Sequence, residues 1–207
     1  CDCRESMDKG VLVDFTKAIA KELGMSAHIK VDPLARSMQN VIGGQVNFHM
    51  PLIKSPGYYQ KDLPYDHSTA TIFHVNFVLY TSKTKPLTME QLKTAKIETD
   101  RAHVEYFPFI TIPSSCIECS LKKISKGRID GFIFADFAAD GFVKANAMSE
   151  LKRKSYRVFD VKIILPKGGQ GSPVDRLLTK AINGLKAKGE YQRIMGAIDL
   201  PYNDWQP

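Results

Sequence analysis

The feature that most constrains the fold is an internal repeat. Segments 37–47 and 120–130 match at their first serine, at their apolar positions, at the glycine in position 44 or 127, and at the closing Asn or Asp; the offset is constant at 83 residues (127 minus 44). Each copy predicts an amphipathic helix that ends at a glycine and leads into a β-branched strand. Two copies predict two α/β lobes of similar size, although helix, glycine and strand follow one another in many α/β proteins.

Strands and helices alternate along the rest of the chain. Helices are predicted over 14–23, 34–42, 87–93, 116–125, 137–147 and 172–189, and strands over 27–31, 46–50, 71–81, 96–99, 110–112, 129–135 and 157–165. Alternation of this kind predicts mainly parallel sheets, whose ligands bind at the carboxyl ends of strands. The two long extended stretches, 71–81 and 157–165, bracket the middle of the chain as the strands of a hinge would.

Charge and hydropathy argue against two classes of protein. The chain has 29 Lys and Arg against 22 Asp and Glu, a net charge of +7 that would attract anionic partners if it were gathered on one face. The densest basic cluster is the short run Lys152–Lys154, and no basic stripe is interleaved with aromatic residues, so we expect a solvated basic surface and no nucleic-acid partner. The best apolar run, 72–79, is far below the ~20 residues that cross a bilayer and is interrupted by His74 and Asn76.

The four cysteines form two close pairs, Cys1 with Cys3 and Cys116 with Cys119. The C-x-x-C spacing of the second pair fits a redox pair, half of a zinc site or a local disulfide. A zinc site needs two more ligands, which only the first pair or scattered histidines could supply. We therefore favour a structural bridge between Cys116 and Cys119 in an oxidising compartment and expect no metal, while a free thiol pair stays open.

Several short motifs follow one another in a fixed order. The first motif, Gly10–Gly24, leads through Asp14 into a helix. The second occurs twice, as Gly-Gln-Val-Asn at Gly44–Asn47 and as Gly-Arg-Ile-Asp at Gly127–Asp130. The third is the helix over 172–189 followed by Glu190–Ile194. Their order and spacing resemble those of the family 3 extracellular solute-binding proteins, the polar amino-acid type of the periplasmic binding-protein superfamily. The resemblance covers about 10–191, nearly the whole chain.

The resemblance implies an α/β chain with the two-lobed periplasmic binding protein type II fold. Lobe one would hold 1–77 plus 166–207 and lobe two 78–165, each a mainly parallel sheet flanked by helices, joined by two hinge strands. Such a protein is a monomer without a cofactor, closes on a small solute and hands it to the membrane permease of an ABC importer. It works in the periplasm or outside the cell after its signal peptide has been removed. Cys1–Asp2 also resembles the start of a mature lipoprotein, and the family's first strand would be abbreviated here.

The resemblance also implies half of a binding site. In the family's amino-acid binders, a Ser/Thr-Pro-x-Arg turn supplies an arginine that holds the ligand carboxylate. The corresponding turn runs from Ser55 through Pro56 and Gly57 to Tyr58, so tyrosine replaces that arginine. Asp136 matches the acidic residue that receives the ligand amino group. The cation half-site is present, and the carboxylate half-site is not.

Three interpretations of this difference stay open. In the first, Arg4 or Arg101 takes over the carboxylate. In the second, the solute is an amine, a peptide-like or an aromatic polar compound without a free α-carboxylate, with Tyr58, Tyr59 and Phe137 as walls. In the third, the chain no longer binds transport solutes and serves as a ligand-sensing or accessory domain. The predicted ligand-binding residues are Arg4, Met50, Ser55, Tyr58, Tyr59, Arg101, Asp136 and Phe137. We expect Asp136 to face the segment 50–58 across the cleft, and its alternative role is to cap the helix that begins at Phe137.

Two further function classes remain. A few proteins of this architecture are cyclohexadienyl dehydratases, and His67, His103, Glu105 or Asp136 could serve as the acid. Nothing in the sequence orders these residues into a pair, so we expect a binding protein and not an enzyme. A sensor domain of a membrane receptor would share every cleft residue.

Overall fold

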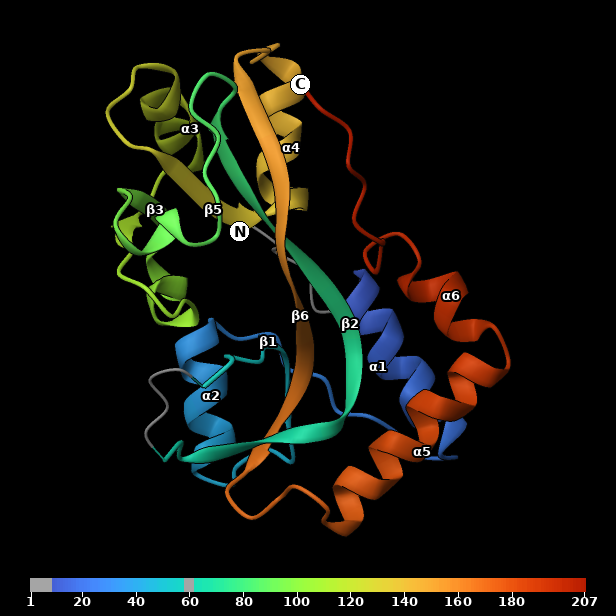
Figure 1. The fold of residues 1–207 in the computed structure, drawn as a ribbon. Helices are drawn as coiled ribbons and strands as arrows, with labels where there is room; N and C mark the ends of the chain where they lie inside the picture. Colours follow the sequence, from blue (N-terminus) through green and yellow to red (C-terminus); the bar gives the residue numbers. More distant parts are fainter. Residues whose placement is uncertain (1–8, 58–61) are drawn as a thin grey trace. The chain divides into compact units, whose positions relative to one another are not determined.

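The computed structural model, shown in Figure 1, describes residues 9–57 and 62–207. Arg4, Tyr58 and Tyr59 of the predicted site lie outside the described residues, as do Cys1 and Cys3. The elements are α1 Val11–Glu22, α2 Leu34–Ile42, β1 His49–Ile53, β2 Tyr65–Ser82, η1 Gln91–Lys93, β3 Ile97–Asp100, η2 Arg101–Tyr106, β4 Ile112–Ser114, α3 Ile117–Ser125, β5 Gly131–Ala135, α4 Asp136–Ala145, β6 Leu151–Pro166, α5 Pro173–Ala187 and α6 Glu190–Met195. None of the described helices is long and apolar enough to span a membrane.

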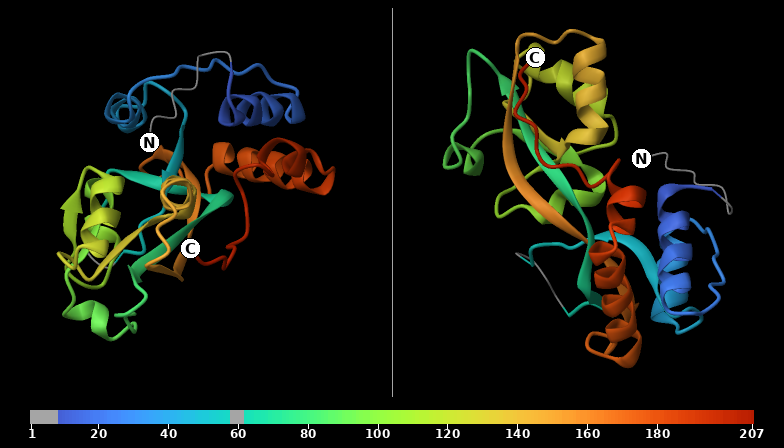
Figure 2. Two further views of the ribbon diagram at one scale, coloured as in Figure 1. Left: turned by 90° about the horizontal axis from the view of Figure 1, so that it is seen from above. Right: turned by 90° about the vertical axis from the view of Figure 1, so that its right-hand side faces the viewer.

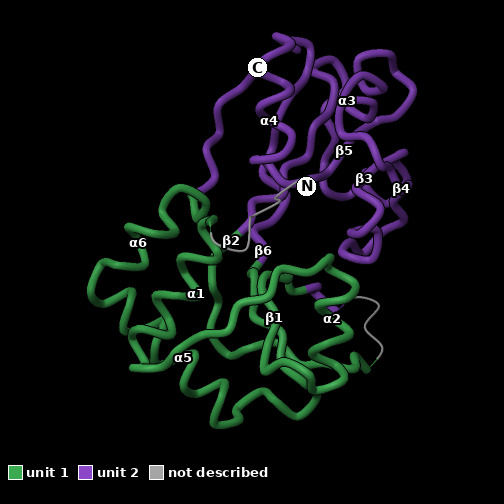
Figure 3. The backbone as a smooth tube through the Cα atoms, turned by 180° about the vertical axis from the view of Figure 1, so that it is seen from behind, with its two compact units in different colours: residues 1–54, 61–74, 160–200 green, residues 55–60, 75–159, 201–207 purple. Residues whose placement is uncertain are grey.

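The chain divides into two compact units, coloured separately in Figure 3. Unit 1 is Cys1–Lys54, Lys61–His74 and Asp160–Leu200, and unit 2 is Ser55–Gln60, Val75–Phe159 and Pro201–Pro207. The long strands β2 and β6 each contribute residues to both units, because the divisions fall within them. The structure groups the last seven residues with unit 2, whereas the sequence placed them with lobe one.

The strands form one mixed sheet in the order β1-β6-β2-β5-β3-β4. In unit 2, β3 runs parallel to β4 on one side and to β5 on the other, with Glu98 opposite Ile112 and Phe132. β5 is antiparallel to β2, and in unit 1 β1 is antiparallel to β6. The sheet is less parallel than the alternation predicted, because the two long strands also pair within it.

Helices α1, α5 and α6 pack together in unit 1 and lie side by side in Figure 2. Phe15 and Ile19, four residues apart, are buried on one face of α1, as the helical spacing predicted. At the start of α5, the Ser172 hydroxyl accepts the N–H of Asp175 at 3.3 Å, and Pro173 opens the helix. The sequence pattern therefore predicts the core face of α1 and the start of α5.

One predicted strand is absent from the described chain. Residues 27–31 belong to no strand, and Val31 is exposed. A β-branched sequence forms a strand only when a neighbouring strand pairs with its N–H and C=O groups. No described strand of unit 1 pairs with this segment, so the prediction of a strand was wrong here.

Unit 2 contains a buried ion pair between β6 and α4. The side chain of Arg153 is 0% exposed, and its Nε and Nη2 donate to the two carboxylate oxygens of Asp140 at 2.8 and 2.6 Å. Its Nη1 donates to the carbonyls of Asn203 and Trp205 at 3.0 and 2.7 Å, and its guanidinium carbon lies 4.4 Å from the centre of the Trp205 ring. These contacts hold the C-terminal segment 201–207, the tail, on unit 2.

The buried arginine corrects the expectation of a wholly solvated basic run. Successive side chains of a strand point to opposite faces, so Lys152 and Lys154 are exposed while Arg153 between them points inward. The three charges looked alike in the sequence because no apolar residue separated them. Because side chains alternate between the two faces of a strand, Arg153 points inward when Lys152 and Lys154 point outward.

Candidate functional site

Three predicted site residues lie where parallel strands of unit 2 end. Asp136 is the first residue of α4, directly after β5, and Arg101 is the first residue of η2, directly after β3. Because β3 and β5 are parallel neighbours, both residues lie at the carboxyl edge of the same sheet. Arg101 is exposed, and Phe137, next to Asp136, is 63% exposed. This edge of unit 2 is therefore the candidate site.

The carboxylate of Asp136 is half-buried and has neutral donors. Asn76 Nδ2 donates to Oδ2 at 3.1 Å, and the Phe137 N–H donates to Oδ1 at 2.7 Å. Burial raises the pKa of Asp136 above its usual value, and these two hydrogen bonds oppose the rise only in part. A partly desolvated carboxylate with uncharged donors retains a strong attraction for a cation or a further hydrogen-bond donor.

Asp136 does not occupy the N-cap position that its alternative role required. The helix begins at Asp136 itself, and the N-cap is Ala135, which makes no side-chain capping bond. The bond from the Phe137 N–H gives Oδ1 a local structural role. Oδ2 accepts one bond from Asn76, and a carboxylate oxygen has room for a second donor.

Asn76 is a site residue that the sequence reasoning missed. It lies on β2 and is 5% exposed. A buried amide is costly unless it is hydrogen-bonded, so a polar residue inside the apolar run 72–79 was a usable signal. His74, the other polar residue of that run, lies in unit 1, where its N–H and Nδ1 bond Asp199 at 2.9 and 3.1 Å.

Aromatic rings surround His103, one of the nominated acids. Its ring centre lies 5.5 Å from that of Phe77, 5.5 Å from that of Phe134 and 4.9 Å from that of Tyr106. Burial lowers the pKa of His103, although Asp100, with Oδ1 3.2 Å from Nδ1, opposes the change. The imidazole is therefore neutral at pH 7 and forms part of an apolar wall. Asp100 also accepts the Ala102 N–H at 2.9 Å, which caps η2.

The remaining predicted residues with a described structure are held by local contacts. Met50 lies on β1 in unit 1, where its sulfur is 3.6 Å from the hydroxyl oxygen of Thr16 on α1. The Ser55 hydroxyl accepts the N–H of Gly57 at 3.4 Å. That Met50 faces Asp136 stays a prediction.

The C-x-x-C pair is joined. Cys116 and Cys119 form a disulfide at the start of α3. No group of three or more His, Cys, Asp or Glu among residues 9–57 and 62–207 could hold a metal ion. Of the arrangements that the sequence left open, the structure contains the local bridge.

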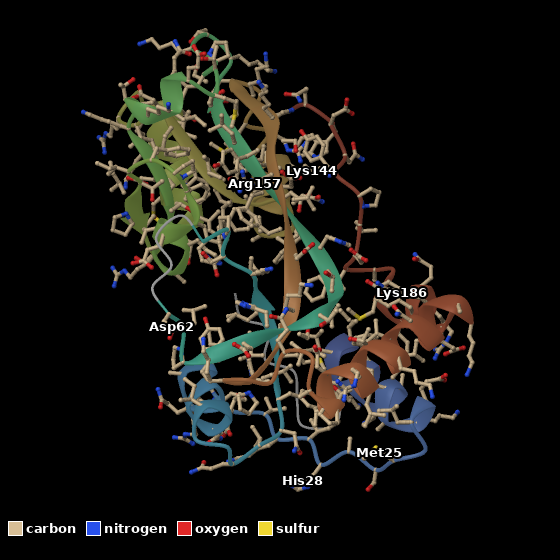
Figure 4. All side chains as sticks on the ribbon, turned by 60° about the horizontal axis from the view of Figure 1, so that its bottom comes forward. Met25, His28, Asp62, Lys144, Arg157 and Lys186 are labelled. Atoms are coloured by element: carbon tan, nitrogen blue, oxygen red, sulfur yellow. A yellow bond between two sulfur atoms is a disulfide. The ribbon has the colours of Figure 1, made fainter. Side chains whose placement is uncertain are left out.

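Basic side chains are spread over both units, and several lie against aromatic rings. Three of those labelled in Figure 4 make such contacts: Lys144 over Trp205 at 4.4 Å, Arg157 over Phe159 at 6.0 Å and Lys186 over Tyr191 at 4.8 Å. These charges partner rings of their own unit.

Solved structures show which fold this arrangement belongs to. The GluR0 ligand-binding core from Nostoc punctiforme, in complex with L-glutamate, has a TM-score of 0.63 and 17% identity over 93% of this chain and 92% of that chain. The chain has the type II periplasmic-binding-protein fold. The arginine-, lysine-, histidine-binding protein ArtJ from Geobacillus stearothermophilus (TM-score 0.57, 19% identity, 91% and 84% covered) and a histidine kinase sensor domain (TM-score 0.59, 16% identity, 91% and 85% covered) share this type II fold. No protein-family model matches the sequence, and no curated protein matches it.

Proposed function

We propose that this chain, which has the type II periplasmic-binding-protein fold, is a family 3 solute-binding protein. Its ligand would be a small polar solute that carries a cationic or hydrogen-bond-donating group. The protein works outside the cytoplasm and delivers the solute, an amino acid, amine or related compound, to the membrane permease of an ABC importer. The observation that carries the proposal is the half-buried carboxylate of Asp136, whose donors among residues 9–57 and 62–207 are neutral and which lies at the carboxyl edge of β5. Two similar proteins are described with amino acids as ligands, which supports this solute class.

The chemistry of the edge favours recognition of an ammonium group. A solute ammonium would donate to Oδ2 of Asp136 in a charge-assisted bond, which is stronger than a bond between neutral groups. Arg101, exposed at the same edge, is the predicted residue that could meet a carboxylate. If Arg101 binds the carboxylate, the solute is an α-amino acid. If it does not, either Arg4 binds the carboxylate or the solute is an amine or a related compound without one.

Isothermal titration calorimetry of variants at Asp136 and Arg101 tests the proposal. The protein is unfolded and refolded to remove bound solute and is then titrated with L-arginine, L-lysine, L-glutamate and putrescine. A hydrogen bond to a charged group contributes about 1.5–3 kcal/mol, so Asp136→Asn should weaken the best ligand about 10- to 100-fold. The melting temperature of the empty protein should change little. Glu105→Gln, which alters an exposed carboxylate on η2, is the matched control and should bind as the unaltered protein does.

Two outcomes would count against this site. If Asp136→Asn binds as tightly as the unaltered protein while Asp136→Ala melts markedly earlier, the carboxylate serves only the start of α4. Arg101→Ala should weaken amino acids and leave putrescine unchanged if the carboxylate is read there. An equal loss for both solutes would contradict that role.

A sensor domain is the second candidate, because one of the similar structures is a histidine kinase sensor domain. Solute-dependent stimulation of ATP hydrolysis by a permease from the same source, reconstituted in liposomes, would support delivery. The Cys116–Cys119 disulfide fits an oxidising compartment, which both candidates require. We propose binding without chemistry, so cyclohexadienyl acids should be recovered unchanged after incubation with the protein.

A further inference from the structure

We propose that the Cys116–Cys119 disulfide is a redox-active site that exchanges with low-molecular-weight thiols while the protein stays folded. The bridge lies at the amino end of α3, a helix of nine residues. Cys116 is the N-cap of this helix, and its Sγ accepts the N–H of Cys119 at 3.1 Å. The proposal concerns this bridge alone and does not depend on the solute.

The position of Cys116 makes it a good leaving group. When the bridge opens, its sulfur becomes a thiolate that keeps the hydrogen bond from the Cys119 N–H, now with a charged acceptor. The positive end of the helix dipole stabilises the same charge. Thiolates at helix N-termini and in C-x-x-C motifs are favoured, and a more stable thiolate leaves faster.

Exposure decides which sulfur is attacked. Cys119 is an exposed residue and Cys116 a partly buried one, and we infer that an external thiolate attacks the sulfur of Cys119. The attack forms a mixed disulfide with Cys119 and breaks the S–S bond, and Cys116 departs as a thiolate. A second thiol then attacks the external sulfur of the mixed disulfide and releases Cys119 as a thiolate. The protein gains two electrons, and the two external thiols become one disulfide.

The start of α3 has anchors that do not involve sulfur. The Ser120 hydroxyl donates to Oε2 of the buried Glu98 at 2.6 Å, and Lys123 Nζ donates to Oε1 at 2.7 Å. The Cys116 N–H donates to the hydroxyl of Ser114 at 3.2 Å. These contacts tie the first two turns of α3 to β3 and β4. Moreover, the bridge closes a loop across a sequence separation of only three, and short loops constrain the unfolded chain least. The reduced helix should therefore stay in place.

The first experiment measures reduction of the native protein. In the full chain carrying Cys1→Ser and Cys3→Ser, thiols are counted by maleimide mass shift after incubation with 10 mM dithiothreitol or with glutathione buffers, without denaturant. Two thiols per chain should appear and should disappear again with glutathione disulfide. The circular dichroism spectrum should not change, and the melting temperature should stay within a few degrees. Thiols that appear only together with unfolding would overturn the proposal.

The second experiment tests the roles of the two sulfurs. Iodoacetamide alkylation is followed against pH in Cys119→Ser, which keeps Cys116, and in Cys116→Ser, which keeps Cys119. Cys116 should reach half of its maximal rate at least one pH unit lower than Cys119. Glutathione disulfide should form its mixed disulfide faster with Cys119 than with Cys116 at equal thiolate fraction. Equal alkylation midpoints, or the reverse order, would refute the proposed leaving group.

Discussion

Replacement of Arg153 by methionine tests the buried ion pair between Arg153 and Asp140 in unit 2. The substitution removes the guanidinium and leaves Asp140, whose side chain is 15% exposed, with hydrogen bonds from the Tyr80 hydroxyl at 2.6 Å and the Trp205 Nε1 at 3.1 Å. Breaking a buried pair by removing one partner costs about 3–5 kcal/mol, because the other charge stays desolvated. At about 2–4 °C per kcal/mol for a chain of this size, the melting temperature should fall by roughly 6–20 °C.

Urea unfolding followed by tryptophan fluorescence measures this loss. The chain has one tryptophan, Trp205, and it lies in the tail that Arg153 holds, so the signal reports on the affected region. Lys154→Met is the matched control, since it removes an exposed charge one residue away on β6 and should change the free energy of unfolding by no more than about 0.5 kcal/mol. Arg153→Met combined with Asp140→Asn should lose less than the sum of the single changes, because no buried charge is then unpaired. The reasoning is wrong if Arg153→Met unfolds like the control.

Three further predictions concern other parts of the chain. Burial alone would raise the pKa of Asp175, but hydrogen bonds from Thr69 and Gly171 outweigh it and hold the pKa below its usual value. In urea unfolding experiments, the free energy of unfolding should therefore fall more between pH 5 and pH 2 for the unaltered protein than for Asp175→Asn. Equal falls for the two proteins would contradict this. Burial lowers the pKa of His67 to about 4, below the 6.5 of an unfolded chain, so its contribution to stability is complete above pH 6.5 and is lost as the pH falls to 4. His67→Gln should flatten the stability curve in that window, whereas a change at the exposed His28 should not. Gly141→Ala should stabilise α4 by about 1 kcal/mol in thermal melts, because a Cβ there meets no atom within 4 Å; a lower melting temperature would show that the helix needs glycine.

The parts of the fold that could be predicted from the sequence are those with local signals. The apolar spacing of Phe15 and Ile19, the capping sequence at Ser172 and the end of β5 before Asp136 depend on neighbours in the chain. The parts that could not be predicted depend on distant partners. The failure of 27–31 to form a strand depends on the absence of a pairing partner in the described chain, and Asn76 reaches Asp136 only after β2 pairs with β5.

The candidate site was predictable to a similar extent. The sequence indicated Asp136 and Arg101 through the strands that precede them, since the end of a strand is a local property. It could not indicate that burial raises the pKa of Asp136 or that aromatic rings hold His103 neutral. Those properties arise from contacts among β2, β5 and η2, which no spacing rule encodes.

The tail also bears on the order in which the chain can fold during synthesis. The side-chain amide of Gln206 accepts the N–H of Arg153 at 3.1 Å and donates to its carbonyl at 3.0 Å, so one glutamine satisfies the backbone of β6 as a neighbouring strand would. Unit 1 likewise needs 160–200 for α5 and α6. Neither unit therefore has its full set of contacts while its C-terminal residues are still on the ribosome. Whereas many domains fold one after another as they emerge, these two units should reach their final packing only after residues 160–207 have left the ribosome.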